Sequence, residues 1–429
     1  MAPQKLNIAV WHNLPSGGGK RALYEHVKGL AQRGHHIEVW CPSTADMDYL
    51  PLSEFAQEHV IPFHWQSPPK SGRVQNIMYP YRWIETKLSA MERHCAECAK
   101  EISAKKFDVL FVNACMFFRS PPLARMLNQL PSVIYLGEPY RWLYEALPSL
   151  PWLAMPDSGE NPYTPKRLKR FLRDLIQVQG YRLQAREERR NAEVFGRILV
   201  NSLYSRESIL RAYGLDSTVC YLGVDGELFS PNGAVREGFV IGLGSLTPEK
   251  GPDVAIRALA AIPAKKRPEL KWVGNVAFPH YLDELVKLAA DLNVRFDPKV
   301  NVSDSELIDL LNRASLMLYT SQLEPFGFAP LEANACGTPV VAIAEGGVRE
   351  TVFNMENGLL VHDRDPQTLG RAVLTLLDNE QLTNRLGNAG RQMVEERWTW
   401  ESAIDNLEAQ LIRIIAVKDG GERGLKNEL

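Results

Sequence analysis

Short apolar runs alternate with amphipathic helical stretches along almost the whole chain. The strand-length runs are LNIAVWH, HIEVWCP, FDVLFVNA, SVIYLGE and RILVNS in the first half, and GFVIGLGS, LKWVGN, LMLYTS and TPVVAIAE in the second. This alternation is typical of repeated βαβ units, in which helices cover a parallel sheet. Because 429 residues exceed the size at which one hydrophobic core stops growing, we expect two doubly wound α/β domains.

The boundary between these domains is expected near residues 222–238, where Gly, Pro and Asn cluster in SPNGAVREG. We therefore divide the chain into a first domain, 1–222, and a second domain, 223–400. A C-terminal helix, 401–429, is expected to cross back to the first domain.

Residues 140–193 interrupt the alternation. Their first part is rich in aromatic residues and prolines, and residues 166–190 carry nine Lys or Arg against three Asp or Glu in a helical pattern. One interpretation is a long solvated helix that covers the first domain. The other is a platform for an anionic or lipid-linked acceptor, with Trp142, Trp152 and Leu153 at an apolar interface.

Composition excludes several classes of protein. A net charge of −2 argues against a protein that mainly coats nucleic acid or an anionic membrane, although a local patch could bind either. The N-terminal residues show no basic leader, and no segment approaches the roughly 20 apolar residues that span a bilayer. We expect a cytoplasmic protein, with peripheral contact at the inner membrane face left open. The six cysteines include one close pair, CAEC, and are interpreted as reduced thiols.

The segment from residue 318 to 352 carries the strongest chemical signal. Glu324 follows an apolar strand, and Glu332 comes eight positions later inside a helical stretch. Ligands of open α/β sheets bind at the carboxyl ends of the strands, where carboxylates can accept hydrogen bonds from sugar or ribose hydroxyls. Backbone N–H groups at the helix start, residues 326–329, can face a diphosphate.

Two further loops follow strands and suit phosphate groups. Gly244 and Ser245 precede Lys250, whose ammonium can stabilise a leaving nucleoside diphosphate. Gly17, Gly18 and Gly19 follow the first strand and let backbone amides approach a ligand, with Lys20 next to them. Neither loop matches a dinucleotide or Walker A fingerprint.

The spacing of Glu324 and Glu332 resembles the E-x7-E signature of retaining glycosyltransferases of family 4. Other segments resemble that family in the same order, namely PSGGGKRALYEHVKGL, ILVNSLYSRESILRAYG, VCYLGVDGELFSP and IGLGSLTPEKGPDVAIRAL. The resemblance implies the GT-B fold, with two Rossmann-like domains that face an interdomain cleft. It also implies that the second domain holds a nucleotide diphosphate sugar and the first an acceptor.

Two positions depart from the family pattern. Ser245 stands where the family has an arginine, and Gly137 where many members have a histidine near the reacting sugar. Glu138, beside Gly137, is our candidate for orienting the sugar or acceptor hydroxyl, and His12 is the nearest histidine.

The resemblance implies a retaining glycosyltransferase that acts in glycan, glycolipid or polysaccharide biosynthesis on a glycan or lipid-linked acceptor. The predicted catalytic residues are Glu324, Lys250 and Glu138. The predicted donor-binding residues are Gly17, Gly18, Gly19, Lys20, Gly244, Ser245, Lys250, Glu324, Phe326, Gly327, Phe328 and Glu332.

We predict no cofactor and no metal, because DMD at 46–48 and DRD at 363–365 lack the strand context of a metal-binding Asp-x-Asp. We also predict no nucleic-acid partner. A catalytically inactive sugar-nucleotide-binding subunit and a sugar-nucleotide epimerase remain alternatives.

Overall fold

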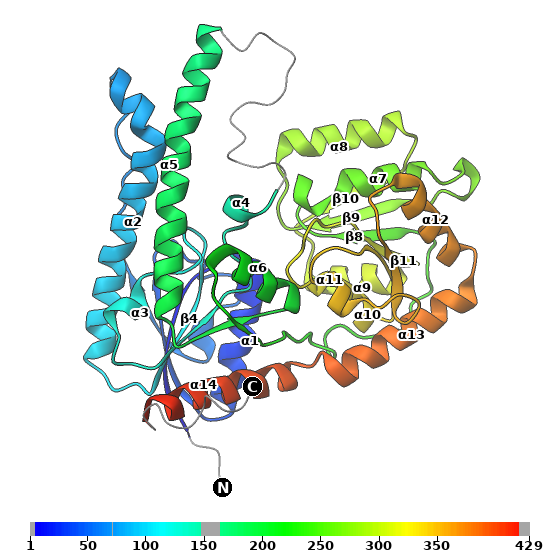
Figure 1. The fold of residues 1–429 in the computed structure, drawn as a ribbon. Coiled ribbons are helices and arrows are strands. Elements are labelled where there is room, and N and C mark those ends of the chain that lie inside the picture. The colour runs from blue at the N-terminus through cyan, green and yellow to red at the C-terminus, as the bar shows by residue number, and fades with distance from the viewer. Residues whose placement is uncertain (1–4, 71, 147–163, 420–429) are drawn as a thin grey trace. The chain divides into compact units, whose positions relative to one another are not determined.

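The computed structural model describes residues 5–70, 72–146 and 164–419. The chain divides into two compact units (Figure 1). Unit 1 comprises Met1–Asn201, Arg206–Cys220 and Ile404–Leu429, and unit 2 comprises Ser202–Ser205 and Tyr221–Ala403. Trp152 and Leu153, named above as interface residues, lie outside the described residues.

Unit 1 contains a seven-stranded parallel sheet in the order β3-β2-β1-β4-β5-β6-β7. Its strands are β1 (Asn7–Asn13), β2 (His36–Pro42), β3 (Gln57–Ile61), β4 (Val109–Cys115), β5 (Ser132–Tyr135), β6 (Arg197–Val200) and β7 (Thr218–Val219). The central strands are almost fully buried, as expected for parallel strands covered on both faces.

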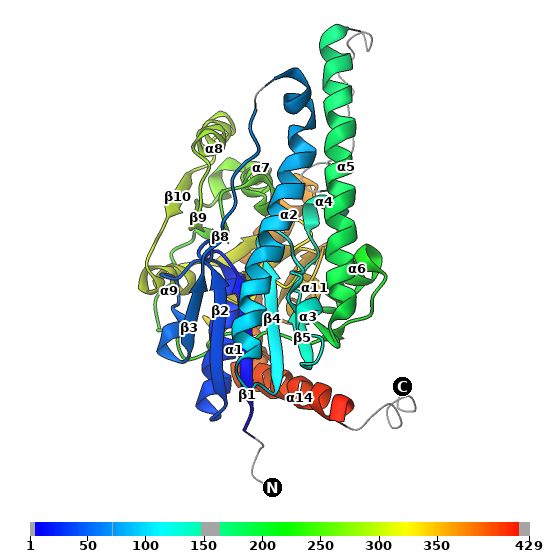
Figure 2. The same cartoon turned by 90° about the vertical axis from the view of Figure 1, so that its left-hand side faces the viewer.

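The helices of unit 1 cover this sheet. They are α1 (Gly18–Gln32), α2 (Arg73–Ser103), α3 (Leu123–Met126), α4 (Arg141–Tyr144), α5 (Pro165–Val194), α6 (Leu203–Tyr213), whose first residues belong to unit 2, and most of α14 (Trp400–Asp419). Helices α2 and α5 lie side by side, and both extend past the sheet (Figures 1 and 2). The C-terminal helix packs on α1, where a Cβ at Gly29 would lie 2.6 Å from Ile404 Cγ1.

Unit 2 contains a six-stranded parallel sheet in the order β10-β9-β8-β11-β12-β13. Its strands are β8 (Val240–Leu243), β9 (Leu270–Gly274), β10 (Phe296–Val300), β11 (Leu316–Tyr319), β12 (Val340–Ile343) and β13 (Gly358–Val361). Its helices are α7 (Pro252–Ala260), α8 (Pro279–Asp291), α9 (Asp304–Arg313), α10 (Phe328–Ala335), α11 (Val348–Thr351), α12 (Pro366–Leu377) and α13 (Glu380–Arg397), and short 3₁₀ turns include η2 (Pro248–Lys250).

Both units are doubly wound, which confirms the predicted fold class. The strand order reverses between β1 and β4 in unit 1 and between β8 and β11 in unit 2. Ligands of open α/β sheets bind outside the carboxyl ends of the strands at such a reversal. The loops after β1, β4, β8 and β11 are therefore the first places to look for a site.

Candidate active site

In unit 2, close backbone contacts and hydrogen bonds join the loops after β8 and β11. Gly251 has φ 70°, and a Cβ there would lie 2.6 Å from the carbonyl oxygen of Thr320. The Thr320 hydroxyl donates to the Gly251 carbonyl at 2.8 Å, and the Gln322 N–H donates to the Glu249 carbonyl at 2.7 Å. These contacts fix where the side chains of both loops begin.

The loops after β8 and β11 bring two predicted residues together. Lys250 Nζ lies 2.5 Å from Glu324 Oε2, with side chains 27% and 20% exposed. Gly244 supports this pair, because a Cβ at that position would lie 3.3 Å from Cγ and Cδ of Lys250. A cation and a carboxylate are thus held at the carboxyl edge of the sheet, both partly open to solvent.

A glycine turn supports the Glu324 loop from the other side. A Cβ at Gly346 would lie 2.4 Å from the Glu324 carbonyl oxygen, and one at Gly347 would lie 2.1 Å from that of Pro325. The Gly347 N–H donates to the Glu324 carbonyl at 2.7 Å. Only glycine permits this close approach, so the packing of the two loops is enough to require Gly346 and Gly347, whether or not they also contact a ligand.

The predicted donor residues on α10 occupy different environments. Gly327, with φ 101°, precedes the helix, and no side chain caps its N-terminus. Glu332 lies inside the helix and is 3% exposed. Phe326 is buried, and its ring packs edge to face against Phe328 at 5.4 Å and against Trp398 at 5.6 Å.

Ser245 stands where the family pattern has an arginine, and its neighbours are uncharged. Its hydroxyl lies 3.3 Å from Asn275 Oδ1, and the preceding Gly244 carbonyl accepts a hydrogen bond from Trp272 Nε1 at 2.8 Å. The loops after β8 and β9 therefore meet through neutral groups at this point.

In unit 1, the glycine loop and Lys20 follow β1. Gly17 has φ 132° and precedes α1, which begins at Gly18 and continues through Gly19. The Lys20 side chain is fully buried, and its Nζ has no hydrogen-bond partner among the described residues. Burial lowers the pKa of Lys20, an effect opposed by the nearby acidic groups, Glu58 first. The structure thus places this ammonium beneath the loop rather than on its surface.

His12, the alternative histidine at the end of β1, is also fully buried. Burial, together with the charge of Lys20, holds the pKa of its imidazole well below the usual range. Its Nδ1 accepts a hydrogen bond from the Leu14 N–H at 3.4 Å. His12 is therefore a neutral buried side chain in this structure.

Glu138 lies after β5 and is held by two arginines. Arg119 Nη2 is 2.6 Å from Glu138 Oε1, and Arg141 Nε is 3.5 Å from Oε2. Arg119 itself follows β4, so this cluster lies at the carboxyl edge of the sheet of unit 1. Sequence analysis missed both arginines, although RSPP directly after FDVLFVNACMFF was a signal for Arg119.

The two Asp-x-Asp tripeptides serve local turns. Asp46 Oδ1 accepts hydrogen bonds from the N–H groups of Asp48 and Tyr49 at 3.0 and 2.9 Å. Asp365 caps α12 by accepting from the Thr368 N–H at 2.9 Å. Within residues 5–70, 72–146 and 164–419, no cluster of three or more His, Cys, Asp or Glu could hold a metal ion.

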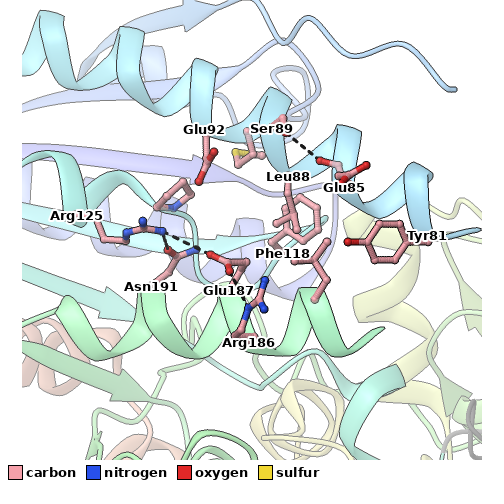
Figure 3. Close-up of a pocket in the computed structure, with 13 residues that line it drawn as sticks. Tyr81, Glu85, Leu88, Ser89, Glu92, Phe118, Arg125, Arg186, Glu187 and Asn191 are labelled. Carbon is pink, nitrogen blue, oxygen red and sulfur yellow. Dashed lines mark hydrogen bonds and ion pairs between the residues drawn. The ribbon is translucent and has the colours of Figure 1, made fainter. Parts of the chain in front are cut away.

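A cavity of about 310 Å³ lies elsewhere in unit 1, between α2 and α5 (Figure 3). Glu187, in its wall, is paired with Arg186 at 3.1 Å and lies 3.7 Å from Arg125. Glu85 and Glu92 line the opposite side from α2. None of the predicted catalytic or donor-binding residues lines this cavity, but Leu183, Arg186 and Glu187 of the basic stretch 166–190 do.

Helices of the described part of the chain are too short or too polar to cross a membrane.

Two family models match the sequence, and together they span most of both units. The model for Glycosyltransferase Family 4 matches residues 16–228, and that for glycosyl transferases group 1 matches residues 227–393. The second match contains the Lys250–Glu324 pair, and the first contains the glycine loop and Glu138.

Similar curated proteins include two D-inositol 3-phosphate glycosyltransferases. That of Streptomyces coelicolor is 37% identical over 175 residues, which are 37% of each chain. That of Catenulispora acidiphila is 30% identical over 233 residues, 49% of this chain and 56% of the relative. The matched part of the chain thus spans about half or less of these relatives.

Solved structures match over nearly the whole chain. Anabaena Alr3699/HepE in complex with UDP and glucose has a TM-score of 0.66 at 19% identity and covers 95% of this chain and 99% of its own. Sucrose-phosphate synthase from Thermosynechococcus elongatus has a TM-score of 0.69 at 20% identity, with 95% and 98% covered. This likeness shows the fold, which is the GT-B fold expected from the sequence.

Proposed function

We propose, because the chain belongs to the glycosyltransferases of family 4, that it transfers a sugar from a nucleotide diphosphate sugar to an acceptor hydroxyl with retention of anomeric configuration. The observation that carries the proposal is the Lys250–Glu324 pair at 2.5 Å. It lies at the carboxyl edge of the sheet of unit 2, beside the reversal of strand order between β8 and β11.

In this proposal the donor binds to the loops of unit 2. Lys250 stabilises the negative charge that develops on the leaving diphosphate, and the N–H groups at the start of α10 add to that stabilisation. Glu324 accepts hydrogen bonds from hydroxyls of the transferred sugar, and Glu332 from the ribose. The Lys250 contact keeps the Glu324 carboxylate oriented before the donor arrives.

Catalysis then depends mainly on positioning and electrostatics. The sugar reacts on the face from which the diphosphate leaves, and a phosphate oxygen takes the proton of the acceptor hydroxyl. Unit 1 holds the acceptor at the carboxyl edge of its sheet, where Glu138, fixed by Arg119 and Arg141, orients the reacting hydroxyl. No step in this route requires a metal ion or another cofactor.

The acceptor is proposed to be a glycan or a lipid-linked molecule. The basic composition of residues 166–190 favours an acceptor that carries negative charge. D-inositol 3-phosphate, named for the similar Streptomyces coelicolor enzyme, is one compound of that kind. A cytoplasmic location with peripheral contact at the inner membrane face fits such an acceptor.

The direct test is a thermal-shift panel of UDP-, GDP-, ADP- and dTDP-sugars, followed by NMR of the product. A ligand at 100 times its Kd stabilises the protein by roughly 2.7 kcal/mol, which such a panel resolves. We expect one nucleotide to stand out and Lys250→Met to lose most of its shift. Lys266→Met is the matched control, because Lys266 pairs with Asp378 at 2.7 Å on the surface of the same unit.

The outcomes separate the alternatives. A product with the donor's anomeric configuration supports the proposal, and an inverted product contradicts it. Donor binding accompanied by neither sugar transfer nor slow hydrolysis of the donor would favour an inactive binding subunit. Conversion of the sugar nucleotide without an acceptor would favour an epimerase.

A further inference from the structure

The distal half of α5 exposes a stripe of leucines. Leu168, Leu172 and Leu175 are 58%, 48% and 43% exposed. Spacings of four and three residues place the three side chains on one face of the helix. A helix in a globular protein normally buries its apolar stripe, whereas no described residue covers this face of α5 to the extent of burying it.

The rest of the helix behaves differently. Gln184, Glu188 and Asn191, in the proximal half, are buried in unit 1. Between the halves, Gly180 allows α5 to approach α2, since a Cβ there would lie 2.8 Å from Ile84 Cδ1. The proximal half is therefore anchored, while the distal half presents apolar side chains to solvent.

Basic side chains occupy the faces of the helix that the leucine stripe leaves free. Residues 165–176 contain five Lys or Arg and one acidic residue, Asp174, which gives a net charge of +4. Lys169, Arg170 and Arg173 are exposed. At roughly 100° per residue, Lys169, Arg173 and Arg170 lie about 100°, 140° and 200° around the helix from Leu168, so Lys169 is the nearest to the stripe and Arg170 is on the opposite face. An exposed apolar stripe on one face and cations on the others are the composition of an interfacial helix.

The distal half is also placed where a flat surface could reach it. In two perpendicular views, the ends of α2 and α5 project together beyond the sheet of unit 1 (Figures 1 and 2). Ile77, near the start of α2, is 39% exposed and adds an apolar side chain to this end. The two helices pack against each other, which supports the ends that extend past the sheet.

We propose that Leu168, Leu172 and Leu175, together with Lys169, Arg170 and Arg173 on the polar faces of the same helix, form a docking surface for an anionic lipid bilayer. The leucines would enter the boundary between head groups and acyl chains, and the cations would contact lipid phosphates. A second copy of the chain fits less well, because it would bring two strongly basic helix ends together. This surface belongs to unit 1, whereas Lys250 and Glu324 belong to unit 2, and it does not depend on the proposed transfer reaction.

The test is co-sedimentation of the full chain with vesicles of phosphatidylcholine alone or mixed with phosphatidylglycerol, across a salt series. We expect binding to the mixed vesicles that weakens as salt rises, because surface charges are screened over about 8 Å at physiological salt. Replacing the leucines should lower vesicle partition at least roughly tenfold. Replacing the cations should lower it roughly a hundredfold and flatten the salt dependence.

The leucine variant has a control that changes leucines elsewhere. The leucine variant is L168Q/L172Q/L175Q, the cation variant is K169Q/R170Q/R173Q, and the control is L210Q/L228Q, which changes two leucines exposed elsewhere. Unchanged thermal unfolding and donor binding would show that all three proteins are folded.

Three results would overturn the proposal. They are absence of wild-type binding to anionic vesicles, equal binding by the leucine variant and the wild type, and a wild-type dimer that L168Q/L172Q/L175Q abolishes. The last result would assign the stripe to a second copy of the chain.

Discussion

Changing Glu188 to glutamine tests how the buried polar network of unit 1 responds to pH. Glu188 lies on α5 and is fully buried. Its carboxylate accepts hydrogen bonds from Gln184 Nε2 at 2.9 Å, the Arg119 backbone N–H at 3.2 Å and the Tyr213 hydroxyl at 3.0 Å. Burial outweighs these bonds and raises the pKa of Glu188 from 4.5 to about 7.

The sign of the effect follows from this rise. Below the unfolded pKa of 4.5 the carboxyl is protonated in both states and does not reduce stability. Between pH 4.5 and about 7 the unfolded chain releases the proton while the folded chain keeps it, so the free energy of unfolding falls as pH rises. At about 1.4 kcal/mol per pKa unit, the full shift costs about 3 kcal/mol.

Glutamine can keep the same network without ionising. Its amide oxygen can accept from Gln184 and from the Arg119 N–H, and its NH₂ can donate to the Tyr213 oxygen. We therefore expect E188Q to be more stable than the wild type at about pH 8 by up to about 3 kcal/mol, with the difference disappearing near pH 4.5.

Urea unfolding of both proteins over this pH range measures the difference directly. E193Q is the control, because Glu193 is an exposed residue on the same helix. A stability difference between E188Q and the wild type that stays constant with pH would refute the reasoning, as would a wild type that gains stability relative to E188Q as pH rises.

Three further predictions concern unit 2. Glu332→Ala should weaken donor binding and Glu324→Ala should lower turnover, each by roughly tenfold or more, since a hydrogen bond to a charged group contributes about 1.5–3 kcal/mol. If either variant binds the donor and turns over like the wild type, that residue is not part of the site. Activity should survive EDTA, and loss that Mg²⁺ or Mn²⁺ restores would show that an Asp-x-Asp was wrongly dismissed. Arg236→Met should lower the free energy of unfolding by roughly 3 kcal/mol or more, because its guanidinium donates to the Ala314 and Gly337 carbonyls at 2.5 and 2.6 Å; an unchanged melting temperature would contradict this.

The central strands were predictable from sequence because parallel strands buried on both faces are continuous apolar runs. The edge strands were not. In β3 the residues Gln57, Glu58 and His59 are polar, and in β10 Pro298 and Asp297 interrupt the apolar pattern. An edge strand is covered less completely, so its sequence carries a weaker signal. The strand β13, which was also missed, is the other edge strand of unit 2.

The candidate site was predictable residue by residue but not as a set of contacts. Lys250 and Glu324 were each identified from the motif around them, yet they are 74 positions apart, and only the folded loops show that they form an ion pair. Of the arginines that hold Glu138, Arg119 was marked only by its position after a predicted strand, and Arg141 had no motif to mark it. The burial of Lys20 could not be predicted either, because the sequence around a lysine that follows a glycine loop does not show whether its side chain points outward or into the core.

The packing around the glycines limits which residues the loops of the two units can hold, and it does so more strictly in unit 2 than at Gly17 of unit 1. In unit 2, Cβ atoms at Gly251, Gly346 and Gly347 would each lie within 2.6 Å of a backbone oxygen, so the loops that carry Lys250 and Glu324 admit few other residues. In unit 1, a Cβ at Gly17 would meet no atom within 4 Å. The loops proposed to hold the donor are therefore fixed by packing even before a ligand binds. At Gly17, which was also predicted to bind the donor, the positive φ favours glycine and the surrounding packing does not demand it.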